Sequence, residues 1–303
     1  MRGMKKILLT GATGFIGKAL TRHFSETEYQ IRALIHPSSK SPDLPKGIPV
    51  EAFVSGLNDL RGLQAALVGV DIVYHLASEE ALGARGDLLG TDIQGTRNMV
   101  QAAEEAGVER FIYLSHLGAD RASAYPVMTA KAIAEDHIRK SGLDYTILRT
   151  GVVYGPQDRF TTSLSNLIRG IPLIFPLPDK GDTLLQPLWI EDLANILLWT
   201  LDNPKTKREL YEIGGPEQLS FREIISTLLN VMGLKRTLVS INTPLIRIAT
   251  LFADYLSIDI PTDVFWLDYL ATNRTCSLNT IPHIFNLLPS YFSKRLEYLR
   301  PEE

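Results

Sequence analysis

Short runs of apolar and β-branched residues alternate with longer amphipathic stretches through the first half of the chain. A short continuous apolar run is typical of a strand buried on both faces of a sheet, whereas apolar residues at helical spacing indicate a helix packed on that sheet. Strands that alternate with helices form parallel sheets, because each parallel return needs a crossover. The pattern predicts strands at 5–10, 29–36, 50–54, 70–77, 109–115 and 144–150, and helices near 15–25, 59–68, 87–106 and 127–140.

This alternation predicts an α/β fold, a doubly wound parallel sheet of the Rossmann type, over residues 1–150. Beyond residue 150 the alternation is lost and prolines become frequent. Strand-like pieces and a helix lie within 184–213, and we expect them to complete the first domain. The rest of 151–303 is predicted to form a smaller, mostly helical carboxy-terminal lobe. Within it, Ser220 and Glu223 have the spacing of a capping box that starts a helix.

Composition narrows the class of protein. The chain has 303 residues and a formal net charge of −3, which gives no reason to expect binding to nucleic acid. Its single cysteine excludes an internal disulfide, and its six histidines show no metal-ligand spacing, so we expect no metal site. The apolar run at 7–9 is too short for a signal peptide, and no uncharged run of about 18 residues exists to span a membrane. We therefore expect a cytoplasmic protein without a transmembrane segment, with peripheral attachment to a membrane as the alternative.

Three glycines stand between the first predicted strand and the first predicted helix. Gly11 permits a tight turn, Gly14 lets the backbone approach a pyrophosphate, and Gly17 allows the helix to pack closely on the sheet. The helix amino terminus then offers free N–H groups and a positive dipole end to the phosphates. Because the glycines lie in the strand–turn–helix context that such a loop requires, the sequence predicts a dinucleotide-binding site.

Several segments together resemble those of extended and atypical short-chain dehydrogenase/reductases. They are the glycine loop, "VYHLAS" at 73–78, the segment 92–115 and "LRTGVVYGP" at 148–156. The resemblance covers nearly the first 200 residues, and it is nearest to the nucleotide-binding accessory subunit of respiratory complex I and to NmrA-like dinucleotide sensors. It implies a smaller lobe that covers the cofactor. The cofactor-binding residues that it implies are Gly11, Thr13, Gly14, Phe15, Ile16, Gly17, His36, Lys40, Leu76, Ala77, Ser78, Lys131 and Val153.

The end of the second predicted strand bears on the choice between the two nicotinamide dinucleotides. An NAD-specific fold places an acid there, which accepts a hydrogen bond from the ribose 2′-hydroxyl. Here His36 takes that position and Lys40 follows shortly after, so no carboxylate repels a 2′-phosphate. We therefore expect NADP(H) as the cofactor, with NAD(H) as the alternative.

The resemblance also implies a catalytic serine, tyrosine and lysine. Ser115 and Lys131 match the serine and the lysine, but Val127 stands where the tyrosine belongs, four residues before the lysine. The spacing matters because residues i and i+4 share one helix face, where a cation lowers the pKa of a phenol. Tyr125 is the nearest candidate for a displaced proton donor, although Pro126 fits the first helical position and places Tyr125 at the cap. The candidate catalytic residues are thus Ser115, Lys131 and Tyr125.

Two functions stay open on the sequence. The first is a dinucleotide-binding protein with little or no ordinary reductase turnover, which acts as a sensor, chaperone or assembly subunit. The alternative is an NADPH-dependent reductase, isomerase or dehydratase that takes its proton from a displaced donor. The apolar stretch 244–258 carries only Arg247 and Asp254 as charges, near one face, so we also expect the lobe to bind an apolar small molecule or a protein partner.

Overall fold

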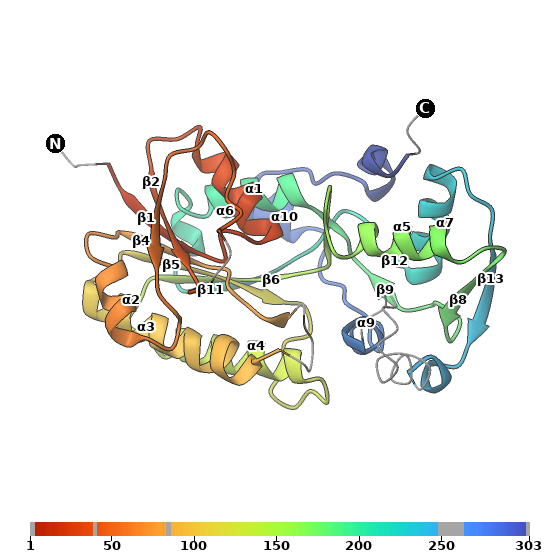
Figure 1. Ribbon diagram of the computed structural model, residues 1–303, viewed down its shortest axis with the longest axis horizontal. Coiled ribbons are helices and arrows are strands. Elements are labelled where there is room, and N and C mark those ends of the chain that lie inside the picture. Colours follow the sequence, from red (N-terminus) through yellow and green to blue (C-terminus); the bar gives the residue numbers. More distant parts are fainter. Residues whose placement is uncertain (1–3, 39–40, 81, 83–85, 248–263, 301–303) are drawn as a thin grey trace.

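The computed structural model describes residues 4–38, 41–80, 82, 86–247 and 264–300 (Figure 1). Its centre is a seven-stranded sheet in the order β11-β6-β5-β4-β1-β2-β3, in which every neighbouring pair is parallel. This confirms the predicted doubly wound α/β fold. The strands are β1 (Lys6–Thr10), β2 (Gln30–Ile35), β3 (Val50–Val54), β4 (Ile72–His75), β5 (Arg110–His116), β6 (Tyr145–Thr150) and β11 (Glu209–Ile213).

Helices cover both faces of this sheet (Figure 1). One face packs on α2 (Leu60–Ala66), α3 (Thr96–Ala106) and α4 (Pro126–Arg139), and α3 continues from the π-helical turn η2 (Leu88–Gly95). The other face packs on α1 (Phe15–Phe24), α6 (Ile190–Trp199) and α10 (Thr280–Phe285). Alternate strand residues serve the two faces: Leu8 belongs to the first core, whereas Ile7 and Leu9 belong to the second. A sheet buried on both sides explains why its strands are continuous apolar runs.

Local chemistry sets several helix boundaries. Tyr125 is the cap of α4 and Pro126 opens its first turn, as the sequence predicted. Ser220 and Glu223 form the predicted capping box at the start of α7 (Phe221–Val231). At the other end of a helix, Gly107 terminates α3 in the left-handed conformation, with φ of 70°.

The carboxy-terminal lobe combines helices with short two-stranded sheets. Besides α7, its described helices include α5 (Thr161–Gly170) and α9 (Val264–Tyr269), and these three pack around a third apolar core. The apolar stretch 244–258 is helical as far as Arg247, and from residue 248 on it lies outside the described residues. Among the described residues, no helix is both long and apolar enough to cross a membrane. The remaining elements are β7 (Val153–Tyr154) with β10 (Leu188–Trp189), β9 (Leu184–Leu185) with β12 (Leu219–Ser220), β8 (Ile174–Pro178) with β13 (Thr237–Ile241), and the 3₁₀ turns η3 (Pro204–Thr206), η4 (Phe292–Lys294) and η5 (Glu297–Leu299).

Candidate functional site

The strand order reverses between β1 and β4, and ligands of open α/β sheets bind beyond the carboxyl ends of the strands at such a point. Here the loop after β1 touches the loop after β4. The Oγ1 of Thr10 accepts hydrogen bonds from the N–H groups of Leu76 and Ala77, at 3.1 and 3.0 Å. A Cβ on Gly11, whose φ is +71°, would lie 2.9 Å from the backbone nitrogen of Ala77. Two predicted cofactor segments are therefore side by side, and Gly11 is required between them.

The amino terminus of α1 has the form of a phosphate cradle. Gly14 is its cap residue and contributes no side-chain acceptor to the first N–H groups of the helix. Thr13 and Gly14 are exposed, whereas Gly17 is buried, and a Cβ on Gly17 would lie only 2.1 Å from the carbonyl oxygen of Gly11. An anion at this end would meet unpaired N–H groups and the positive end of the helix dipole. The residues present therefore fit the pyrophosphate of a dinucleotide.

Aromatic and aliphatic contacts join the glycine loop to the "VVYGP" segment. Phe15, Ile16 and Val153 pack on the same small apolar cluster around α1 and α6. A Cβ on Gly155 would lie 3.2 Å from the Phe15 ring, so the two segments approach closely. Tyr154 of this segment is fully buried and its hydroxyl donates to a backbone carbonyl at 3.5 Å.

The buried ring of His75 links the end of β4 to β1 and to α3 through hydrogen bonds. Because the Oγ1 of Thr10 already accepts two N–H groups, its own proton goes to the Nδ1 of His75, 2.9 Å away. The Nε2 of His75 therefore carries the ring proton and donates to the Oγ1 of Thr96 at 2.9 Å. Burial, aided by the charge of Lys131, lowers the pKa of His75 to about 3. His75 is thus a neutral structural residue of the site.

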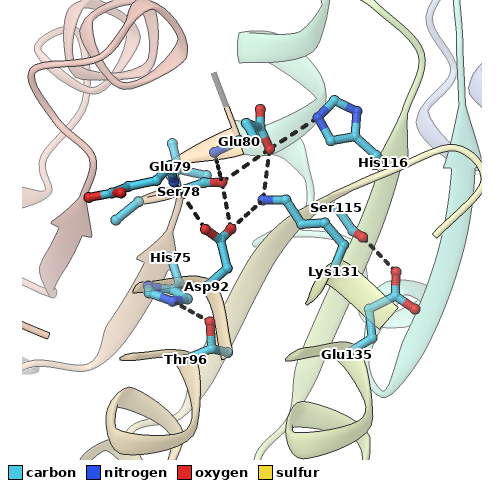
Figure 2. Close-up of polar contacts among 12 residues, drawn as sticks. His75, Ser78, Glu79, Glu80, Asp92, Thr96, Ser115, His116, Lys131 and Glu135 are labelled. Carbon is cyan, nitrogen blue, oxygen red and sulfur yellow. Dashed lines mark hydrogen bonds and ion pairs between the residues drawn. The ribbon is translucent and has the colours of Figure 1, made fainter. Parts of the chain in front are cut away.

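Lys131 lies at the centre of a buried polar cluster (Figure 2). Its Nζ is 2.9 Å from a carboxylate oxygen of Glu80 and 3.4 Å from one of Asp92. The same oxygen of Glu80 is 3.0 Å from the Nε2 of His116, and the hydroxyl of Ser78 donates to Asp92 at 2.5 Å. The ammonium group also lies over the ring of Tyr113, with 5.5 Å between Nζ and the ring centre. The cluster gathers residues from the loop after β4, from η2, from β5 and from α4.

Charge pairing outweighs burial within this cluster. Burial alone would lower the pKa of Lys131, but the carboxylates of Glu80 and Asp92 raise it above its usual value. Burial would likewise raise the pKa of Glu80, yet the neighbouring His116 and Lys131 hold it well below its usual range. Lys131 is therefore a fixed cation at neutral pH, and Glu80 is its counter-ion.

Ser115 and Tyr125, the other candidate catalytic residues, make their contacts outside the Lys131 cluster. Ser115 is buried and its hydroxyl donates to Glu135 at 2.6 Å, one helical turn along α4 from Lys131 (Figure 2). Glu135 also accepts two hydrogen bonds from Arg149, at 2.9 and 2.7 Å. Val127 is 5% exposed and packs in the core of the lobe. Tyr125 is partly buried and lines a different cavity, next to the loop after β5.

His36 and Lys40 are the two residues that were predicted to favour NADP(H) over NAD(H). His36 is exposed and directly follows β2, so a histidine occupies the position where an NAD-specific fold has a carboxylate. Lys40 lies outside the described residues.

Glu80, Asp92 and His116 were not among the predicted site residues. A signal for His116 was present, because neighbouring residues of an extended strand point in opposite directions. If Ser115 faces α4, His116 must face away from it, toward Glu80. Glu80 and Asp92 carried no comparable signal, since an acid in a loop or in a polar helical turn is usually solvated.

Comparison with known proteins decides the family. A family model described as NAD(P)H-binding matches residues 11–164, just over half of the chain. The chain belongs to this NAD(P)H-binding family. The match begins in the glycine loop and runs past α4, so it includes the phosphate cradle and the whole Lys131 cluster.

The proteins to which the chain is similar in sequence carry different names. A putative dihydroflavonol 4-reductase of Synechocystis is 30% identical over 250 residues, which cover 75% of this chain and 72% of that protein. Subunit 9 of the NADH dehydrogenase 1 alpha subcomplex of Arabidopsis thaliana is 26% identical, over 71% of this chain and 54% of the subunit. The photosystem II assembly factor Ycf39 of Cyanophora paradoxa is 29% identical, over 47% of this chain and 44% of that factor. The chain therefore spans about half the length of the latter two.

Solved structures confirm the fold over nearly the whole chain. The UDP-glucose 4-epimerase of Thermotoga maritima superposes with a TM-score of 0.75, at 19% sequence identity and with 97% of each chain covered. At this identity the likeness shows a short-chain dehydrogenase/epimerase-like fold and nothing of the substrate.

Proposed function

We propose that this member of the NAD(P)H-binding family binds a nicotinamide dinucleotide without tyrosine-dependent reductase turnover, and that it acts as a dinucleotide sensor or as an assembly subunit. The observation that carries the proposal is the surroundings of Lys131. One helical turn before it, the position of the proton donor is the buried, apolar Val127. Its ammonium group is engaged by Glu80 and Asp92 instead.

Different residues of the chain would bind different parts of the dinucleotide. The N–H groups at the start of α1, with Gly14 and Thr13 at the tip, would hold the pyrophosphate. Leu76, Ala77 and Val153 would line the path toward the nicotinamide. Lys131 would hold the nicotinamide ribose hydroxyls, which then compete with Glu80 for its protons. When bound, such a group supplies or accepts a hydride.

The proposal also includes the preferred dinucleotide, the domain boundaries and the assembly role. We favour NADP(H) over NAD(H), because His36 rather than an acid follows β2. We also propose that residues 1–150, completed by 184–213, form the binding domain and that the rest of 151–303 is the partner lobe. The names of two relatives, a complex I subunit and a photosystem assembly factor, support an assembly role.

Titration calorimetry with NADPH and NADH tests the proposal. We expect both to bind the wild-type protein, NADPH at least as tightly as NADH, while NADPH oxidation over a panel of carbonyl and enone compounds stays at background. Absence of binding would contradict the function as a whole. NADH binding about tenfold tighter than NADPH, a difference of about 1.4 kcal/mol, would contradict only the preference for NADP(H).

One observation favours a second candidate function, a reductase with a displaced proton donor. His116 and Glu80 form an imidazole–carboxylate pair beside Lys131, with 3.0 Å between Nε2 and Oε2. If a carbonyl substrate binds there, its carbon would take a hydride from the reduced dinucleotide and its oxygen a proton from the His116 imidazolium. Water would then return a proton to His116.

Activity assays of matched variants distinguish His116 from Tyr125 as the proton donor. Brisk NADPH oxidation by the wild type that is lost in His116→Gln and kept in Tyr125→Phe would establish His116 as the donor. Loss in Tyr125→Phe alone would instead identify Tyr125 as the displaced acid.

A further inference from the structure

A cavity of about 790 Å³ lies beside α4, apart from the Lys131 cluster. Its walls are the loop from Gly118 to Tyr125, the side of α4 that carries Glu135, the ends of β6 and β11, and the segment Thr272–Arg274 of the lobe. Neither Lys131 nor any residue of the glycine loop lines it. The cavity is therefore distinct from the proposed dinucleotide site.

Most of the charges around this cavity neutralise one another. Arg149 pairs with Glu135 at 2.7 Å and with Glu212 at 3.4 Å. Arg121 and Arg139 both pair with Asp136, at 2.8 and 2.6 Å. These three arginines therefore already have carboxylate partners. The remaining arginine of the cavity wall is Arg274.

Arg274 is held firmly from several directions. It is only 4% exposed, and its Nη1 donates to the carbonyl of Leu117 at 3.2 Å. Its guanidinium lies over the ring of Tyr269, with 5.4 Å between Cζ and the ring centre. A Cβ on Gly118 would lie 1.7 Å from Nη1, so this exposed glycine leaves the space that the guanidinium occupies. The group is thus fixed in place before any ligand arrives.

The remaining edge of the Arg274 guanidinium has no acceptor. Within the part of the chain that the structure describes, neither Nε nor Nη2 of Arg274 has a hydrogen-bond partner, and both are shielded from solvent. These two nitrogens form one edge of the planar fork, the edge that binds two oxygens of a carboxylate or a phosphate side by side. Leaving charged donors buried without acceptors is costly. A ligand oxyanion would remove that cost.

We propose that Arg274 is the anchor of an anion-binding site in this cavity, which takes a ligand with a carboxylate or phosphate group. The anion would accept two parallel hydrogen bonds from Nε and Nη2, while the body of the ligand lies in the cavity beside Tyr125. Because both nitrogens are covered, binding displaces the side chains over them. This inference goes beyond dinucleotide binding and does not depend on it.

The test uses two simple probes on the full-length protein, sodium hexanoate and inorganic phosphate, each against sodium chloride at equal ionic strength. We expect one of them to raise the melting temperature saturably and to give a calorimetric dissociation constant, and the responding probe identifies the anion. Arg274→Gln should weaken that affinity roughly tenfold or more, the effect of losing charge-assisted hydrogen bonds. Arg274→Lys keeps the charge but not the two-nitrogen edge, and should also weaken it.

Arg121→Gln is the matched control, because Arg121 lines the same cavity but is exposed and paired with Asp136. It should bind the probe as the wild type does, and all variants should keep their affinity for NADPH. The proposal is overturned if neither anion binds the wild type saturably, or if the Arg274 variants bind as tightly as the wild type. Should Arg274→Gln fail to fold, the comparison of Arg274→Lys with Arg121→Gln decides.

Discussion

A carboxylate oxygen of Glu80 lies 2.9 Å from the Nζ of Lys131, and this pair brings the loop after β4 against α4. Lys131 is 3% exposed and Glu80 is 29% exposed, so water screens the pair little on the lysine side. The pair thus neutralises a buried cation, and it also engages the ammonium group that we propose for the ribose of the dinucleotide.

Removal of the Lys131 ammonium group should destabilise the fold. Lys131→Met leaves Asp92, which is 1% exposed, without its cation, and breaking a buried pair in this way costs about 3–5 kcal/mol. Urea unfolding at neutral pH measures the loss. The double variant Lys131→Met, Asp92→Asn should recover much of it.

Lys5→Met is the control, since Lys5 pairs with Glu109 at the surface and should lose no more than about 1 kcal/mol. If Lys131→Met is no less stable than Lys5→Met, the cluster contributes nothing to the fold.

Stability should fall with acid because of His75. Its pKa is about 3 in the folded protein, against 6.5 ordinarily, so the unfolded chain takes up the proton first. The contribution is complete above pH 6.5 and is lost as pH falls toward 3, by up to about 1.4 kcal/mol per pH unit. Urea unfolding at several pH values between 7.5 and 4.5 gives the slope.

The variant His75→Gln should flatten this slope, at the cost of lower stability at neutral pH. His283→Gln, at an exposed position, should leave the slope as it is in the wild type. An unchanged slope in His75→Gln would show that other groups control the acid response.

A tyrosine at position 127 should supply the proton donor that the resemblance implies at this position. Val127→Tyr places a phenol one helical turn before Lys131, and general acid catalysis is worth roughly 10²–10⁴ in rate. Since Val127 is 5% exposed, overpacking should cost about 1–3 kcal/mol. NADPH oxidation with a reactive carbonyl compound should rise above the wild-type background.

Val127→Phe adds the same bulk without a hydroxyl and should lose the stability but gain no activity. Equal activity in the two variants would mean that the hydroxyl plays no part in it.

A methyl group at Gly17 should disrupt the phosphate cradle. The added Cβ would lie 2.1 Å from the carbonyl oxygen of Gly11, a backbone atom that cannot yield without moving the loop. Gly17→Ala should weaken dinucleotide binding by at least roughly tenfold and destabilise the fold by about 1–3 kcal/mol. Gly170→Ala, where nothing lies within 4 Å of the added Cβ, should change neither. Calorimetric titration with NADPH and urea unfolding report the two effects.

The sequence predicted those features that depend on local pattern. Apolar periodicity located the strands from β1 to β6, and cap chemistry located Tyr125 and Ser220 at helix starts. The pairing of β8 with β13 was not predicted, because its two segments lie far apart in sequence and β8 contains two prolines.

The site was predicted only in part for a related reason. The glycine loop is one continuous segment, so its glycines could be recognised directly. The Lys131 cluster is assembled from four separate segments, and which way a strand-end side chain such as His116 points depends on where the strand begins its alternation. Likewise, no pattern in the sequence reveals that two nitrogens of Arg274 lack acceptors.

The pairing of β11 with β6 sets an order of events for a chain leaving the ribosome. Glu209–Ile213 complete the sheet edge formed by Thr146–Thr150, so residues 151–208 must be synthesised before that edge is covered. Until then β6 presents unpaired N–H and C=O groups, to which another nascent or partly folded chain can add a strand. A fragment cut at residue 150 would keep this edge of β6 unpaired permanently, whereas a fragment that extends through Ile213 would pair it with β11.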